Sequence, residues 1–356
     1  MDPEELEEAA RARLEPMAYD YFAGGAESES ALRANLASWS RWQLHPHVLR
    51  DVTAVDTATS VLGTPVASPV LVAPTAYHAL AHPDGEAATA RAAAGHGTVM
   101  IVSTLATTSL EDVAAAAPDA PRWFQLYVFS DRGYAGELVD RAAAAGYRAL
   151  VLTVDAPVLG HRPRDARNAF RLPDHLAMAN LPADLPDQYA QAEGSGLAAM
   201  FTDHDRALTF DDLAWLKDRS GLPLVVKGVH RADDAAACVE AGADAVVVSN
   251  HGGRQLDRAV PGAEVLPEVV AAVDGRAEVY VDGGVRRGVD VLTALALGAR
   301  AVLLGRPVLW GLAVDGEQGV TAVLEDLRAD LDRAMTLSGI THASSVPRDL
   351  VRPAPW

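Results

Sequence analysis

The segment Ser249–Asp257, with the sequence SNHGGRQLD, brings several residues that can do chemistry into one short stretch. His251 can exchange a proton near neutral pH, and Arg254 can bind a carboxylate through two parallel hydrogen bonds. The two glycines between them allow the backbone to turn sharply and to approach a ligand closely. An apolar run at 245–248 places this turn where a buried strand ends. The segment therefore predicts a site that holds an anion beside a general base.

The composition limits the kinds of partner that such a site would serve. The chain has 356 residues, of which 49% are hydrophobic, and a formal net charge of −18. This length and apolar content suit a large packed domain, whereas the acidic excess argues against nucleic acid and anionic membranes as partners. Cys238 is the only cysteine, and we find no signal peptide and no apolar run of membrane length. We therefore expect a soluble protein of the cytoplasm.

A regular alternation of apolar runs and alanine-rich helical stretches begins near residue 70. Strands that are buried on both faces read as continuous apolar runs, and an Ala-Ala-Gly sequence before such a run is typical of a helix that ends at glycine. Eight β–α units in succession predict an α/β fold of the (β/α)₈ TIM barrel type. A doubly wound open sheet is the alternative, but it usually has a glycine-rich motif after its first strand, which is lacking here. The predicted strands are 70–75, 98–103, 123–128, 149–155, 223–229, 245–250, 278–284 and 301–306.

Three segments lie outside this alternation. Residues 1–69 open with a helix start, an N-cap at Asp2 followed by proline, and we expect an N-terminal helical segment. Residues 172–205 form a connection after the fourth strand that is far longer than usual and rich in Pro, Asp and Ala, which is typical of a lid-like insertion. A closing amphipathic helix is expected over 317–339. The whole chain, 1–356, is then one domain.

Polar residues follow all eight predicted strands, at the end of the barrel where such folds carry their chemistry. Glycines and arginines after the seventh and eighth strands predict a phosphate site made from backbone N–H groups and positive charge. Taken singly, most of these residues have a structural explanation, such as packing for Tyr127 and helix capping for Asp155. Lys227 is harder to explain in that way, because a lysine within an apolar strand is costly unless its charge is used. The histidines at 45, 47, 78, 82 and 96 have no spacing that suggests a metal site, and we expect no metal.

The motifs at these strand ends resemble those of the FMN-dependent α-hydroxy-acid oxidases and dehydrogenases, which include glycolate oxidase, lactate oxidase and mandelate dehydrogenase. The resemblance covers residues 19–339 and rests on YDYFAGGAE, APTA, FQLYV, TVDAP with a later arginine, VVKGV, SNHGGRQLD, DGGVRRG and LGRP. SNHGGRQLD is highly specific. The resemblance implies a (β/α)₈ fold, FMN as cofactor, oxidation of an (S)-2-hydroxy acid and a homo-oligomer, a tetramer.

The resemblance also implies a role for each strand-end residue. His251 would be the base, with Asp155 stabilising its imidazolium and Tyr127 assisting. Arg162 and Arg254 would hold the substrate carboxylate, helped by the hydroxyls of Tyr21 and Tyr127. The residues implied to bind FMN are Pro74, Thr75, Ala76, Ser103, Gln125 and Thr153 along the ring, Lys227 at its pyrimidine edge, Ser249, and Asp282, Gly284, Arg286, Gly305 and Arg306 at the ribityl phosphate.

The substrate and the electron acceptor depend on finer features. Leu105 stands where glycolate oxidase has a bulky tryptophan, and Phe22 and Tyr77 add apolar surface, so we expect a roomy apolar pocket. This favours mandelate or 4-hydroxymandelate, and the chain resembles the bacterial oxidases of these acids. By the resemblance, Ala76 stands where some dehydrogenases of the family carry glycine, which favours O₂ as acceptor with hydrogen peroxide as product. The alternatives are a dehydrogenase with another acceptor, an oxidase of lactate, glycolate or longer aliphatic acids, an FMN-barrel isomerase and a non-catalytic FMN-binding barrel. Proton abstraction from carbon and hydride transfer both stay open as mechanisms.

Overall fold

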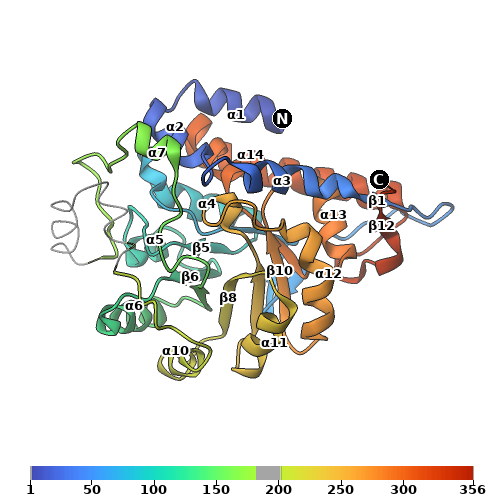
Figure 1. Cartoon of the computed structure of the whole chain (residues 1–356). Helices are drawn as coiled ribbons and strands as arrows, with labels where there is room; N and C mark the ends of the chain where they lie inside the picture. The colour runs from blue at the N-terminus through green and yellow to red at the C-terminus, as the bar shows by residue number, and fades with distance from the viewer. Residues whose placement is uncertain (1, 182–200, 202, 356) are drawn as a thin grey trace.

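The computed structural model describes residues 2–181, 201 and 203–355 and contains a closed barrel of eight parallel strands (Figure 1). Neighbouring strands along the chain pair with one another, and the last closes on the first through the register Leu303 to Leu71. The strands are β4 (Val70–Val72), β5 (Met100–Val102), β6 (Arg122–Leu126), β7 (Leu150–Thr153), β8 (Leu224–Val229), β9 (Ala245–Val248), β10 (Glu278–Asp282) and β11 (Ala301–Leu304). The predicted TIM barrel and its eight strands are confirmed, with the observed strands slightly shorter.

Helices cover the outside of the barrel because apolar side chains lie on both faces of each strand. Side chains alternate between the two faces of a strand, so Val70 and Val72 pack against the helices while Leu71 points into the barrel. The outer helices are α4 (Gly85–His96), α5 (Leu110–Ala116), α6 (Arg132–Ala144), α10 (Asp212–Ser220), α11 (Ala232–Glu240), α12 (Gly262–Val273), α13 (Gly288–Ala296) and α14 (Arg306–Ser338). A short helix, α7 (Pro163–Arg167), lies in the connection that follows β7.

The prediction that residues 1–69 are helical is only partly right. Helices α1 (Pro3–Arg11), α2 (Pro16–Ala23) and α3 (Ser30–Ser38) form, and Asp2 caps α1 by accepting from the backbone N of Glu4 at 2.9 Å. Residues 42–66, in contrast, contain three short strands: β1 (Trp42–Leu44), which pairs with β12 (Val351–Pro353), and the hairpin β2 (Thr59–Val61) and β3 (Thr64–Val66).

The hairpin formed by β2 and β3 closes the amino-terminal end of the barrel. Its buried residues Val61 and Val66 pack with barrel-interior side chains such as Trp123 and Tyr280. The turn between the strands is Leu62–Gly63, and both residues have positive φ (45° and 73°), which suits a two-residue hairpin. The apolar side chains at this end of the barrel interior need an apolar cover, which the hairpin provides. These tertiary contacts explain why strands form where the sequence led us to expect helix.

The opposite end of the barrel is covered by the N-terminal helices, and α1 packs beside α14 (Figure 1). Helix α14 starts at Arg306, shortly after β11, and Asp315 and Gly316 kink it. The predicted closing helix is only the part that follows this kink. Of the predicted insertion 172–205, residues 182–200 and 202 lie outside the described residues. No helix in the described part of the chain is both long and apolar enough to cross a membrane.

The two halves of α14 meet at a pair of glycines. A Cβ atom added to Gly319 would lie 1.9 Å from the carbonyl oxygen of Gly311, whereas one added to Gly95, which is exposed in α4, would meet nothing within 4 Å. We predict that Gly319→Ala destabilises the protein by about 1–3 kcal/mol, because the halves must move apart. The control Gly95→Ala should be neutral or stabilising by up to about 1 kcal/mol. Urea unfolding of both variants measures this, and equal stabilities would show that the glycine contact relaxes without cost.

Candidate active site

A cavity lies among the carboxyl ends of the barrel strands and is lined by almost all of the sequence-predicted site residues. These are Tyr21, Pro74, Thr75, Ala76, Ser103, Leu105, Gln125, Tyr127, Thr153, Arg162, Lys227, His251, Arg254, Asp282, Gly284, Arg286, Gly305 and Arg306. The predicted residues Asp155 and Ser249 do not line the cavity. Asp155 contacts His251 and Ser249 contacts Lys227, and both of these partners line the cavity.

The turn after β9 places His251 in the cavity through an unusual backbone conformation. His251 has φ 58°, in the left-handed region, which costs a non-glycine residue of order 1 kcal/mol or more. Its backbone N donates to Ser249 Oγ at 3.0 Å, and the Asn250 side chain accepts from the backbone N of Gly253 at 3.1 Å. The amides of Asn250 and Asn35 also bond to each other, at 2.7 and 2.8 Å. This network holds the strained turn in place.

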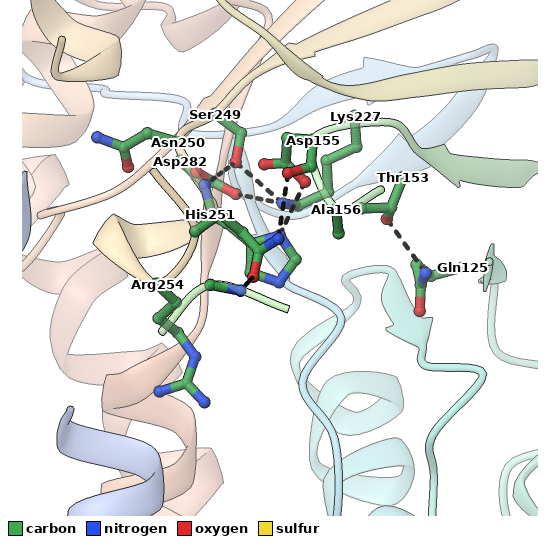
Figure 2. Close-up of polar contacts among 12 residues, drawn as sticks. Gln125, Thr153, Asp155, Ala156, Lys227, Ser249, Asn250, His251, Arg254 and Asp282 are labelled. Atoms are coloured by element: carbon green, nitrogen blue, oxygen red, sulfur yellow. Dashed lines mark hydrogen bonds and ion pairs between the residues drawn. The ribbon is translucent and has the colours of Figure 1, made fainter. Parts of the chain in front are cut away.

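His251 and Asp155 form the predicted base and carboxylate pair. The Nδ1 of His251 lies 2.9 Å from Asp155 Oδ1 (Figure 2). Because a carboxylate only accepts, Nδ1 carries the proton and Nε2 is left as a proton acceptor. Burial lowers the pKa of His251, although the charge of Asp155 acts in the opposite direction. The imidazole is therefore neutral at pH 7 and suited to act as a base.

Lys227 lies between two acidic side chains and a hydroxyl. Its Nζ is 3.2 Å from Asp282 Oδ2 and donates to Ser249 Oγ at 2.9 Å (Figure 2). Burial alone would lower the pKa of Lys227, but the carboxylates of Asp282 and Asp155 outweigh it and raise that pKa. A lysine that is 4% exposed thus keeps its charge at the edge of the cavity.

A row of polar side chains crosses the wall formed by β5, β6 and β7. Gln125 Oε1 accepts from Ser103 Oγ at 3.2 Å and from the backbone N of Thr104 at 3.1 Å. Its Nε2 donates to Thr153 Oγ1 at 3.1 Å (Figure 2). All of these groups are buried, so the row presents fixed donors and acceptors to whatever occupies the cavity.

Arg162 and Arg254 lie beside each other, as the prediction of an anion clamp requires. Arg254 donates to the backbone carbonyls of Tyr21 (2.6 Å) and Gly24 (2.9 Å), and its guanidinium lies 4.9 Å from the centre of the Tyr21 ring. Arg162 donates from Nε to the carbonyl of Arg254 at 3.2 Å. Burial and then the neighbouring Arg254 charge lower the pKa of Arg162 to about 10. Two adjacent cations of this kind, Arg162 buried and Arg254 partly buried, favour an anionic ligand.

A second pair of arginines, the partly buried Arg286 and Arg306, lines the cavity near β10 and β11. Arg306 donates to the carbonyls of Phe22 and Gly252 at 3.0 and 3.1 Å, and burial lowers its pKa to about 9. Within the described residues, neither arginine has a carboxylate at ion-pair distance. The adjacent Arg287 differs, because it is half exposed and pairs with Asp2 at 3.0 Å.

Sequence reasoning missed several residues that complete the site. Phe201 lines the cavity, and its ring lies 5.5 Å from that of Tyr127. His78 is buried, with Nε2 2.5 Å from the hydroxyl of the cavity residue Thr75. Phe201 falls in the insertion and Asn35 in the N-terminal segment, and neither carries a motif that would mark it.

Comparison with known proteins identifies the family. Residues 10–353 match the family model described as FMN-dependent dehydrogenase. The chain belongs to this family. Its relatives include an L-lactate oxidase from Nostoc sp., 52% identical over 96% of this chain and 95% of that protein, and 2-hydroxyacid oxidase 1 from Mus musculus, 46% identical over 99% of this chain and 96% of that protein. A solved structure of a mandelate oxidase with (S)-4-hydroxymandelic acid is 43% identical, with a TM-score of 0.92 over 99% of this chain and 98% of that one.

The FMN-dependent dehydrogenase family implies FMN as the cofactor, and the cavity fits it. Arg286 and Arg306 are partly buried cations that suit an anion such as the ribityl phosphate. Asp282 Oδ1 is buried without a hydrogen-bond partner and can accept from a ligand hydroxyl. The protein is thus an FMN-dependent oxidoreductase of the 2-hydroxy acid oxidase family.

The contrast between Arg286 and Arg287 gives a direct test of the phosphate site. Replacing Arg286 with Ala should weaken FMN binding about 10- to 100-fold, because a hydrogen bond to a charged group is lost in a partly buried place. Replacing Arg287 with Ala should change FMN affinity less than about twofold, because that side chain is exposed and paired with Asp2. Titration of the apoprotein with FMN, followed by flavin fluorescence, measures both. A larger loss in the Arg287 variant would contradict the assignment.

Proposed function

We propose that the protein oxidises (S)-2-hydroxy acids with an apolar side chain, mandelate or 4-hydroxymandelate foremost, to the 2-oxo acids, and passes the electrons to O₂ to give hydrogen peroxide. The single observation that carries the proposal is the joint placement of His251, Arg162 and Arg254 at one cavity with an apolar wall. We also propose, from the sequence resemblance, a cytoplasmic tetramer.

The residues of the chain divide the work of this reaction. Arg162 and Arg254 bind the substrate carboxylate and so fix the position of the α-carbon. His251 accepts the proton at Nε2, and Asp155 stabilises the imidazolium that results. Tyr127 offers a protonated hydroxyl, because burial raises its pKa far above the usual range. The bound FMN supplies the two-electron acceptor.

An apolar wall supports a substrate larger than glycolate. Leu105, Phe22 and Phe201 line the same cavity as the two arginines, together with the rings of Tyr21 and Tyr127. Side chains of this kind gain free energy by burying an apolar group of the substrate, and aromatic rings can pack against a phenyl group. The structural likeness to a mandelate oxidase points the same way.

L-Lactate is a second candidate substrate, favoured by the relative named L-lactate oxidase at 52% identity. O₂ as the acceptor is supported by the relatives named oxidases, since both of the curated relatives given above carry that name. A dehydrogenase that uses another acceptor is the alternative to an oxidase that uses O₂.

The substrate proposal predicts an order of catalytic efficiency. We expect kcat/KM for (S)-mandelate to exceed that for glycolate by about tenfold or more, because one buried apolar group is worth 1–3 kcal/mol in discrimination. Leu105→Trp should reduce the efficiency with mandelate far more than with glycolate, because the ring takes up the space beside the substrate side chain. A peroxide assay in air with mandelate, 4-hydroxymandelate, L-lactate and glycolate measures both effects. Higher efficiency with lactate would establish the second candidate, and flavin reduction without peroxide would establish a dehydrogenase.

The base predicts a pH dependence. Because burial lowers the pKa of His251, kcat/KM should be level at neutral pH and fall as the pH drops through a value below the ordinary histidine pKa of about 6.5. Asp155→Asn removes a charge that raises this pKa, so the acid limb should move to lower pH while the plateau rate falls. Stopped-flow flavin reduction across pH checks this, and a limb that moves to higher pH in the variant would contradict the assigned pair.

A further inference from the structure

The side-chain amide of Gln255 makes hydrogen bonds in every direction that an amide allows. Oε1 accepts from the backbone N of Gly160 at 3.1 Å and from the guanidinium of Arg162 at 3.3 Å. Nε2 donates to the backbone carbonyls of Asp155 at 3.2 Å and Val158 at 2.8 Å. An amide has two N–H donors and an oxygen with two lone pairs, so its capacity is used in full.

These partners also fix the orientation of the Gln255 amide. Exchanging Oε1 and Nε2 would place N–H groups against the N–H groups of Gly160 and Arg162, and an oxygen against two carbonyl oxygens. Only one orientation of the amide therefore satisfies all four hydrogen-bond partners. No other side chain of the described residues bonds to the segment 155–162 at both its start and its end.

The segment that Gln255 holds carries two residues of the site. Asp155, at its start, accepts from His251, and Arg162, at its end, belongs to the anion clamp. The segment lies directly against the turn after β9: a Cβ on Gly160 would be 2.5 Å from the carbonyl oxygen of Arg254. Base and clamp are thus set relative to each other where these two loops touch.

The neutrality of the amide matters as much as its geometry. Arg162 is buried next to Arg254, and its nearest carboxylate, that of Asp165, is 3.9 Å away. Gln255 and the carbonyl of Arg254 occupy some of the N–H groups of Arg162 without cancelling its charge. A carboxylate in place of the amide would form an ion pair and compete with an anionic ligand.

We propose that Gln255 is a positioning residue whose uncharged amide holds Asp155 and Arg162 in place while leaving the charge of Arg162 to the substrate carboxylate. This deepens the proposed function, on which it rests only in taking the substrate to be a carboxylate.

The test compares Gln255→Glu, which keeps the size of the side chain but adds a charge and replaces the Nε2 donor with an acceptor, with Gln255→Leu, which removes all of the hydrogen bonds. In FMN-loaded protein, Gln255→Glu should weaken the binding of phenylacetate about tenfold or more and that of the uncharged phenylacetamide less than about threefold. Visible absorbance of the flavin follows both titrations. Gln43→Glu, which adds the same charge at an exposed position in β1, should bind both compounds as the unmodified protein does.

Hydrogen exchange tests the positioning role without any ligand. In Gln255→Leu, the backbone amides of 155–162 should exchange faster, while those of the barrel strands keep their protection. Unchanged exchange in 155–162, or equal losses of phenylacetate and phenylacetamide binding in Gln255→Glu, would overturn the proposal. A protein that binds phenylacetate but oxidises no 2-hydroxy acid would contradict the proposed function alone, since the exchange and binding results on Gln255 would still stand.

Discussion

The cost of burying positive charge is the constraint on which this site depends. Four guanidinium groups, those of Arg162, Arg254, Arg286 and Arg306, line one cavity in a protein whose net charge is −18. Within the described residues, only Arg162 has a carboxylate as near as 3.9 Å. Burial lowers the pKa of Arg162 and Arg306, which measures how unfavourable their charge is without a partner. The folded protein bears this cost, and an anionic ligand reduces it on binding. Part of the free energy of ligand binding therefore comes from pairing these charges.

The N-terminal segment is what allows Arg254 and Arg306 to be held without counter-ions. Its backbone carbonyls at Tyr21, Phe22 and Gly24 accept from Arg254 and Arg306. A glycine is required where this segment meets the turn after β9, since a Cβ on Gly253 would lie 2.5 Å from the backbone N of Leu32. Carbonyl dipoles satisfy the N–H groups but leave the net charge. The segment is therefore part of the active site as well as a cover for the barrel.

The parts of the molecule that the sequence predicts are those set by local patterns. Eight apolar runs gave eight strands, and the polar residues after them met at one end because parallel strands bring their carboxyl ends together. The hairpin at 59–66 was missed, although alternating residues around Gly63 are the signal that a hairpin leaves. Asn35 and Phe201 could not be found in this way. Their roles arise from contacts with Asn250 and Tyr127, which are far away in the sequence, and no local pattern encodes such a contact.

Lys227 differs from the arginines of the site in the kind of partner that it has. The lysine is neutralised by Asp282 at 3.2 Å and held by Ser249, whereas Arg254 and Arg306 are held by backbone carbonyls. A lysine that already has a carboxylate partner adds little net charge, so it contributes hydrogen bonds and polarity to its side of the cavity. The unneutralised arginines supply the net positive charge where carboxylate and phosphate would bind. Whether the partner of a cation is a carboxylate or a neutral amide or carbonyl thus decides where an anion can bind. Gln255 is such a neutral partner of Arg162, the arginine proposed to bind the substrate.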